Sequence, residues 1–226
     1  MKKKTIIISL GGSLIVPDKI DINFLKKFKD LILRYTKKFN FIIFTGGGKI
    51  AREYQTAGKQ VSNISKTQMD WLGISASHLN AKLLCFIFND LADSKIIQIP
   101  TKKIKFKKPI VLAGGWKPGW STDFDAVKIA VVNKIEMVLN LSNIAYAYNK
   151  DPHKYKDAQK IEKITWAEFR KIVGNVWDPG LNMPFDPIAS RLAEKKNIQV
   201  GIMNGKDLKN LENYFKEQKF KGTLIY

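Results

Sequence analysis

Three glycine-rich turns in this chain could bind phosphate groups. They are Gly11-Gly12-Ser13, Gly46-Gly47-Gly48-Lys49 and Gly114-Gly115, and each directly follows a short run of apolar, mostly β-branched residues. Glycine lets backbone N–H groups approach an anion without a Cβ in the way, and a helix after the turn adds the positive end of its dipole. A tight strand-to-helix turn needs glycine even without a ligand, so one turn alone means little. Three turns in corresponding places predict a single polyphosphate site.

The residues after the third turn add further polar groups. Ser121, Thr122 and Asp123 place two hydroxyls and a carboxylate at the expected start of a helix. Thr122 or Asp123 could simply cap that helix. Alternatively, these groups hold a polar ligand, and Asp123 orients lysines around a transferring phosphoryl group or assists Mg²⁺.

Three cations lie in or beside the glycine turns, namely Lys49, Arg52 and Lys117. They would offset the charge of a bound phosphate, although a lysine on a solvated surface needs no ligand. Arg52 is the strongest candidate, because only four of the 39 basic residues are arginines.

A polar and aromatic segment follows a later apolar run. The segment 143–152 combines amide, carboxylate and tyrosine side chains, so Tyr148 could cover an adenine ring and Asp151 could make a polar contact. A β-hairpin with a proline-stiffened turn explains the same composition. His78, His153 and the lone Cys85 are isolated from one another and predict no metal site.

Apolar periodicity predicts strands that alternate with helices. We expect strands near residues 5–10, 41–45, 96–99, 110–113, 136–141, 199–203 and 222–225. Helices are expected at 24–35 after an Asp21 cap, from about 49, at 66–88 and 124–132, after Thr165, and at 188–196 and 208–215. This βαβ succession predicts an α/β fold with a mainly parallel sheet between helices.

Length and charge limit the class of protein. At 226 residues and 45% hydrophobic content, the chain is long enough for one large domain, residues 1–226. No apolar stretch reaches the ~20 residues of a membrane span, which predicts no membrane partner and a cytoplasmic location. The formal charge of +19 is spread along the chain, so we do not expect a nucleic-acid partner despite the basicity.

Two other nucleotide-binding motifs limit the class of enzyme. The Walker pattern is absent, which argues against a P-loop nucleotidase. The segment 46–51 satisfies the dinucleotide fingerprint, and Asp70 lies near the distance expected for a ribose-binding carboxylate. A dinucleotide-dependent oxidoreductase is therefore an alternative.

Taken together, the segments 9–13, 46–52, 114–123 and 148–152 resemble the amino acid kinase superfamily, most closely its uridylate (UMP) kinase branch in the short archaeal-type form. The similarity spans nearly the whole chain. It implies a three-layer αβα sandwich, with an N-terminal acceptor-binding lobe (about 1–135) and a C-terminal ATP-binding lobe (about 136–226). It also implies a hexamer, and the Mg²⁺-dependent transfer of the ATP γ-phosphoryl group to UMP in pyrimidine biosynthesis.

The resemblance also implies roles for individual residues. Asp123 would organise catalysis, and Lys49 is the candidate catalytic cation. The ATP-binding residues would be Gly12, Ser13, Gly48, Arg52, Ser142, Asn143, Tyr148 and Asp151. The UMP-binding residues would be Gly47, Asp70, Trp116, Lys117, Pro118, Gly119, Trp120, Ser121 and Thr122. No protein metal ligand is implied.

This chain departs from the family pattern at three places. Ser9 stands where many members carry lysine, Ala145 and Tyr146 replace an aspartate and a glycine, and the segment 177–184 replaces a small, serine-rich stretch. Two further alternatives follow, namely a kinase of this fold for another small phosphate or acid, and a nucleotide-binding storage or regulatory protein without turnover.

Overall fold

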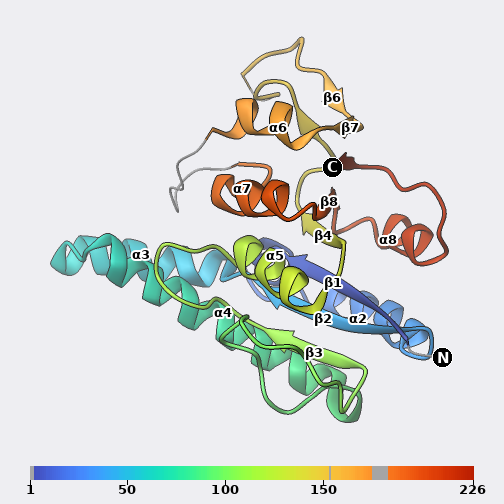
Figure 1. Ribbon diagram of the computed structural model, residues 1–226. Coiled ribbons are helices and arrows are strands. Elements are labelled where there is room, and N and C mark those ends of the chain that lie inside the picture. Colours follow the sequence, from blue (N-terminus) through green and yellow to red (C-terminus); the bar gives the residue numbers. More distant parts are fainter. Residues whose placement is uncertain (1–2, 153, 175–182) are drawn as a thin grey trace.

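Helices and strands alternate along most of the chain in the computed structural model, which describes residues 3–152, 154–174 and 183–226 (Figure 1). The strands are β1 (Lys4–Leu10), β2 (Phe39–Thr45), β3 (Ile110–Ala113), β4 (Met137–Ser142), β5 (Ala147–Tyr148), β6 (Lys160–Ile161), β7 (Lys163–Ile164), β8 (Gln199–Asn204) and β9 (Thr223–Ile225). The helices are α1 (Gly12–Ile15), α2 (Ile22–Tyr35), α3 (Gly48–Ser62), α4 (Lys66–Phe88), α5 (Thr122–Asn133), α6 (Trp166–Val173), α7 (Pro187–Lys195) and α8 (Leu208–Phe215). A 3-10 turn, η1, spans Asn89–Leu91.

Seven strands form one sheet in the order β3-β2-β1-β4-β8-β9-β7. Neighbouring strands are parallel except β8 and β9, which are antiparallel. The predicted mainly parallel sheet is therefore confirmed. The carboxyl ends of β1, β2, β3 and β4 lie at one edge of the sheet, as parallel strands require, and this edge carries the glycine turns.

Helices cover both faces of the sheet. Ile6, Ile8 and Leu10 of β1 pack with buried residues of α2, α4 and α8. Ile7 points to the other face, where the core is built with α5, α6 and α7. Because successive strand residues face opposite sides, a strand buried on both sides needs an uninterrupted apolar run. The three-layer αβα sandwich is confirmed.

Two expectations about local structure were wrong. The segment 96–99 is not a regular strand, because only Ile97 pairs, through the isolated bridge Ile97↔Ala113. Pro100, directly after it, cannot donate to a longer ladder. The cap of α5 is Ser121, whose Oγ accepts from the backbone N–H of Phe124 at 3.1 Å. Thr122 and Asp123 thus lie inside the first turn, and Asp123 is free for other contacts.

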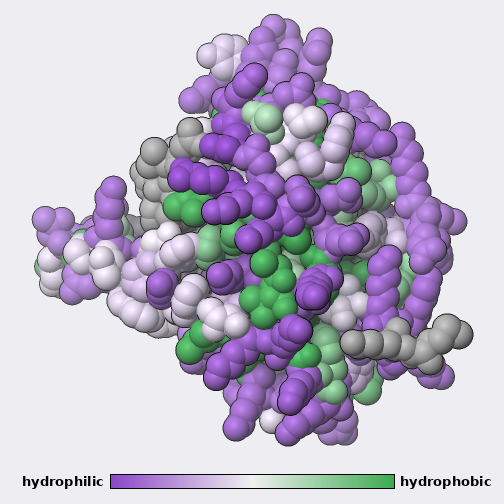
Figure 2. Space-filling view, viewed as in Figure 1, coloured by the Kyte–Doolittle hydropathy of each residue, from purple (hydrophilic) through white to green (hydrophobic). Residues whose placement is uncertain are grey.

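Helix α4 is the one described helix long and apolar enough to cross a membrane, judged by length and composition alone. In its most apolar window 44% is buried inside the fold, where α4 packs against α3, β2 and β3. A buried core helix passes the same test, so this is weak evidence for a span. Hydrophilic side chains cover most of the face in Figure 2, and apolar ones gather toward its middle.

Candidate functional site

A cavity of about 240 Å³ lies beyond the carboxyl ends of β2 and β3. Its walls come from the second and third glycine turns, from α3 and α4, and from the start of α5. The predicted site residues that line it are Gly47, Gly48, Arg52, Asp70, Trp120, Ser121 and Thr122. Five of the nine residues implied for the acceptor thus line one cavity, together with Gly48 and Arg52, which were implied for ATP. Trp116, Lys117, Pro118 and Gly119 do not line it.

The first glycine turn touches the second through backbone atoms. A Cβ on Gly12 would lie 2.1 Å from the backbone nitrogen of Gly48 and 2.5 Å from the carbonyl carbon of Gly46. Gly48 itself has φ +66°, a conformation that glycine adopts without strain. The backbone N–H of Gly11 also donates to the carbonyl of Leu141 at 2.8 Å. The first and second glycine turns therefore lie in direct contact, as expected. The first turn packs between the second turn and the end of β4.

Polar side chains of α4 hold the other two turns in place. Asn80 Nδ2 donates to the carbonyl of Gly46 at 2.8 Å, and the backbone N–H of Gly115 donates to Ser77 Oγ at 2.8 Å. A ring nitrogen of His78 lies 2.8 Å from the carbonyl of Gly115. Sequence analysis missed Ser77 and Asn80, although two polar residues on the buried side of an apolar helix were the available signal.

Asp70 contacts the loop between the third turn and α5. Its Oδ2 accepts from the backbone N–H of Gly119 at 2.7 Å. Within this loop the Trp116 and Trp120 rings lie 5.9 Å apart, and Lys117 Nζ is 4.4 Å from the Trp116 ring centre. The Asp70 carboxylate thus holds the loop that was assigned to the acceptor. The Lys117 ammonium group lies over the two tryptophan rings.

Asp123 lies over the centre of the sheet. Its Oδ1 accepts from Ser9 Oγ at 2.6 Å and from Asn140 Nδ2 at 2.9 Å, and Ser9 and Asn140 are register partners on β1 and β4. Burial raises the pKa of Asp123 to about 6 despite these hydrogen bonds. The serine that replaces the family lysine therefore positions the candidate catalytic carboxylate.

Two further carboxylates lie near Asp123. Burial raises the pKa of Asp125 to about 7, and it raises that of Asp186 as well. Asp125 Oδ2 accepts from the backbone N–H of Trp116 at 2.9 Å, while its buried Oδ1 has no hydrogen-bond partner among the described residues. Asp186 caps α7 and accepts from Ser121 Oγ. Asp186 thus links the start of α7 to the loop before α5, a contact that the sequence did not indicate.

Replacing Asp125 by asparagine is expected to flatten the pH dependence of stability. The pKa of Asp125 is about 7 in the fold, against an ordinary 3.8. The stability that its protonated form contributes is therefore fully present below about pH 4 and is lost as the pH rises through about 7. Asparagine can still accept from Trp116 and cannot ionise.

Between pH 5 and 8 we therefore expect the free energy of unfolding of the wild type to fall by about 2–3 kcal/mol more than that of Asp125→Asn. Urea unfolding at both pH values measures this difference, and Asp90→Asn on the exposed η1 is the matched control. An equal loss in the wild type and in Asp125→Asn would contradict the assignment.

Lys49 is not brought to Asp123. Its ammonium group contacts Asp18 and lies 3.7 Å from Glu53, and it lines a separate hollow of about 500 Å³ next to the first. Arg52 lines both spaces. The geometry therefore favours Arg52 over Lys49 as the cation of the site.

The residues assigned to ATP are only partly gathered. Ser142 ends β4 beside the first glycine turn, and Asn143 follows it. Tyr148 lies on the small β5–β6 ribbon, with Asp151 in the turn after it. None of these residues, nor Gly12 and Ser13, lines the 240 Å³ cavity. β5 does pair with an antiparallel strand, but its partner β6 lies outside the segment 143–152, so no hairpin forms within the segment itself. The roles of these residues stay predictions. His153 and most of the segment 177–184 lie outside the described residues.

Known proteins match this chain over most or all of its length. The model of the amino acid kinase family matches residues 4–204. A uridylate kinase of Pyrococcus abyssi is 30% identical over 224 residues, which cover 97% of this chain and 98% of the relative. A uridylate kinase of Hyperthermus butylicus is 29% identical and covers 100% of this chain and 99% of its own.

Solved structures show the same similarity. The crystal structure of a uridylate kinase from Archaeoglobus fulgidus superposes with a TM-score of 0.81 and 26% identity, covering 99% of this chain and 100% of its own. A UMP kinase from Ureaplasma parvum has a TM-score of 0.75 at 21% identity, covering 100% and 99% of the two chains, and shares the fold.

Proposed function

The chain belongs to the amino acid kinase family, and we propose that it is an ATP-dependent kinase that phosphorylates UMP, giving UDP and ADP. The observation that carries the proposal is the cavity at the carboxyl edge of the sheet, where two glycine turns meet Arg52, Asp70 and the start of α5. The choice of UMP as the acceptor is supported by relatives named uridylate kinase, which align with nearly the whole chain. Family membership also removes the oxidoreductase alternative.

The acceptor would lie in this cavity. The backbone N–H groups of Gly47 and Gly48 and the guanidinium of Arg52 suit its phosphate, since both present fixed donors to anionic oxygens. For Gly48 and Arg52 this replaces the ATP role that the resemblance implied, because both line the same cavity as Gly47. The loop 116–122 would close over the nucleoside, and Asp70 holds that loop through Gly119. Residues 1–135 would thus form the acceptor lobe.

The donor would lie across the first glycine turn, between Gly12 and Ser13 and the end of β4. Ser142, Asn143, Tyr148 and Asp151 would contact its nucleoside, in a lobe of residues 136–226. In-line transfer between two phosphates needs alignment and charge neutralisation rather than a covalent intermediate on the protein. Asp123, held by Ser9 and Asn140 beneath the turns, would organise the charged groups.

Mg²⁺ would enter with ATP. Within the described part of the chain, no three His, Cys, Asp or Glu side chains lie together as a metal cage, and Mg²⁺ is often held by substrate phosphates with one or two carboxylates. Asp123 and the unpartnered, buried Asn140 Oδ1 next to it are suitable oxygen donors. When bound, the ion supplies positive charge at the transferring phosphate.

The test is release of ADP from ATP in the presence of UMP, CMP and small acids, each in turn. We expect turnover with UMP well above that with the other acceptors. Turnover only with another acceptor would mean that the protein is a kinase but that UMP is not its substrate. ATP binding in calorimetry without any turnover would support the storage or regulatory alternative.

Replacing Asp70 by alanine is expected to raise the KM for UMP at least about tenfold with a smaller change in kcat, because the loop loses an anchor that both ground and transition states use. Asp70→Asn keeps an oxygen for the Gly119 N–H and is the matched control. Steady-state kinetics with varied UMP measures both. If the KM for UMP rises equally in both variants, the carboxylate contacts the ligand rather than the loop. If it rises in neither, Asp70 has no role in binding the acceptor.

Assembly with further copies of the chain also belongs to the proposal. Trp71, Leu79 and Phe86 recur at helical spacing on α4 and are 50%, 60% and 68% exposed. Such a row of large apolar side chains marks an interaction surface, and a second copy would cover it. Light scattering should give a mass that is a multiple of 25.8 kDa; six copies, like the cytoplasmic location, stay a prediction.

A further inference from the structure

A further hollow, larger than the two beside the glycine turns, lies away from those turns. It has a volume of about 870 Å³ and is lined by Lys4 and Ile6 at the start of β1, Phe39 at the start of β2, and residues of β7, α8 and β9. Because β1 and β2 carry the glycine turns at their carboxyl ends, this hollow lies at the opposite, amino end of those strands. We call it the amino-end groove. Its volume falls within the ~300–1,000 Å³ of typical small-molecule sites.

The charge of the groove is positive. Four lysines, Lys4, Lys163, Lys219 and Lys221, line it together with Glu162 and Glu217. Both carboxylates are already paired with lysines. Glu162 lies 3.2 Å from Lys160 and 3.6 Å from Lys219, and Glu217 lies 3.5 Å from Lys38. Among the described residues, Lys4, Lys163 and Lys221 have no carboxylate within 4 Å, so three ammonium groups remain for an anion.

Aromatic rings form the other part of the wall. Tyr146, Tyr214 and Phe220 line the groove, and the Tyr214 and Phe220 ring centres lie 5.9 Å apart. Lys160 Nζ lies 5.0 Å from the centre of the Tyr146 ring. Rings beside cations suit a ligand that is itself both aromatic and anionic.

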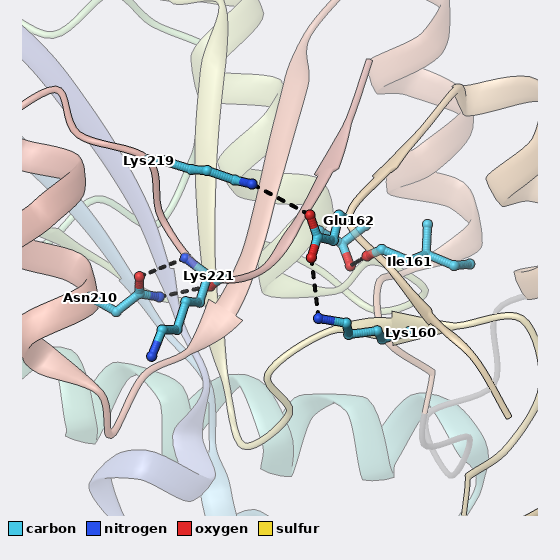
Figure 3. A network of polar contacts seen from close by, with 7 residues as sticks. Lys160, Ile161, Glu162, Asn210, Lys219 and Lys221 are labelled. Carbon is cyan, nitrogen blue, oxygen red and sulfur yellow. Dashed lines mark hydrogen bonds and ion pairs between the residues drawn. The ribbon is translucent and has the colours of Figure 1, made fainter.

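The loop 216–222 that carries two of the lysines is held in place. The side-chain amide of buried Asn210 donates to the carbonyl of Lys221 and accepts from its backbone N–H, both at 2.7 Å. Figure 3 shows Lys160 and Lys219 converging on Glu162, while the Lys221 side chain extends away from that pair. A groove whose loop is already ordered binds at a lower entropic cost.

We propose that the amino-end groove is a second ligand site that binds a nucleoside polyphosphate. The base packs against Tyr146, Tyr214 and Phe220, and the phosphates contact Lys4, Lys163 and Lys221. No bond is made or broken there. The site is separate from the cavity at the glycine turns, and the proposal does not depend on which acceptor that cavity takes.

Photolabelling with 8-azido-ATP, followed by peptide mapping, tests this location directly. We expect label in peptides that contain residues 214–222. Label near the glycine turns or in the segment 142–151, which would contact the ATP nucleoside, reports the separate donor site and serves as an internal control, so the two sites can fail independently. Absence of label from the groove peptides would overturn the proposal.

Charge reversal at the exposed Lys163 and Lys221 sharpens the test. Lys163→Glu with Lys221→Glu is expected to lower groove labelling at least about tenfold and to leave labelling near the glycine turns unchanged. Lys102→Glu with Lys103→Glu, on the exposed loop before the edge strand β3, makes the same change in net charge elsewhere. An equal loss in both double variants would mean general attraction to a basic protein and would overturn the site.

The aromatic half of the proposal has its own measurements. Tyr146→Leu should weaken groove labelling about tenfold, in the range of one base–aromatic contact. Unlabelled ATP should compete better than inorganic triphosphate, which has the phosphates without the base. Equal competition by the two, or no effect of Tyr146→Leu, would overturn recognition of the base. Thermal unfolding of each variant checks that the fold is intact.

Discussion

Alanine at Gly12 is expected to abolish phosphoryl transfer and to lower the free energy of unfolding by at least about 3 kcal/mol. The added Cβ would lie 2.1 Å from the backbone nitrogen of Gly48 and 2.6 Å from the carbonyl oxygen of Gly46. Both are main-chain atoms, so no side-chain rotation relieves the overlap, and overpacking in a close-packed region typically costs about 1–3 kcal/mol even where neighbours can shift. The first and second glycine turns, which would bind the phosphates, would have to move apart.

Gly11→Ala is the matched control, because its Cβ would meet nothing closer than the carbonyl oxygen of Leu141 at 3.0 Å. Urea unfolding and ADP release should both rank the variants as wild type, Gly11→Ala and Gly12→Ala. A Gly12→Ala protein with near wild-type activity would mean that the first turn does not take part in phosphate binding.

The fold was predictable because each element is specified locally. The runs that became β1 and β2 are apolar without alternation, which is what burial on both faces demands, and Asp21 and Thr165 cap their helices as their spacing predicts. The strand predicted at 96–99 is an exception, because a local pattern does not determine pairing. Its short apolar pattern fits a strand, but only Ile97 pairs with the edge strand β3, and Pro100 directly after it cannot donate to a longer ladder.

The candidate site was predictable only in outline. Glycine turns after apolar runs indicated where phosphate could bind, because the carboxyl ends of parallel strands share one edge. The contacts that give each side chain its role join distant parts of the chain, such as Ser9 with Asp123 and Asp70 with Gly119. Lys49 is a further case, since Asp18, 31 residues away in the sequence, holds its ammonium group away from the position that its motif suggests.

Replacing Asp123 by asparagine is expected to lower kcat about a hundredfold or more, with much smaller changes in the KM for ATP and UMP. The proposed role of the carboxylate is to organise charge in the transition state, and losing one such electrostatic group costs about 10²–10³ in rate. Ser9→Ala removes one of the two side-chain donors that hold Asp123. It should cause a smaller loss of kcat, also with little effect on KM.

The pH profile separates this role from a structural one. Burial raises the pKa of Asp123 to about 6, so wild-type kcat should fall as the pH drops through about 6 and the carboxylate takes up a proton. Asp123→Asn should lose that limb and keep its residual rate. A raised pKa also means that the charged form weakens the fold above about pH 6. The variant should therefore be at least as stable as the wild type at pH 8 while far less active. A variant that loses activity and stability together at pH 8 would assign Asp123 to the fold instead of the reaction.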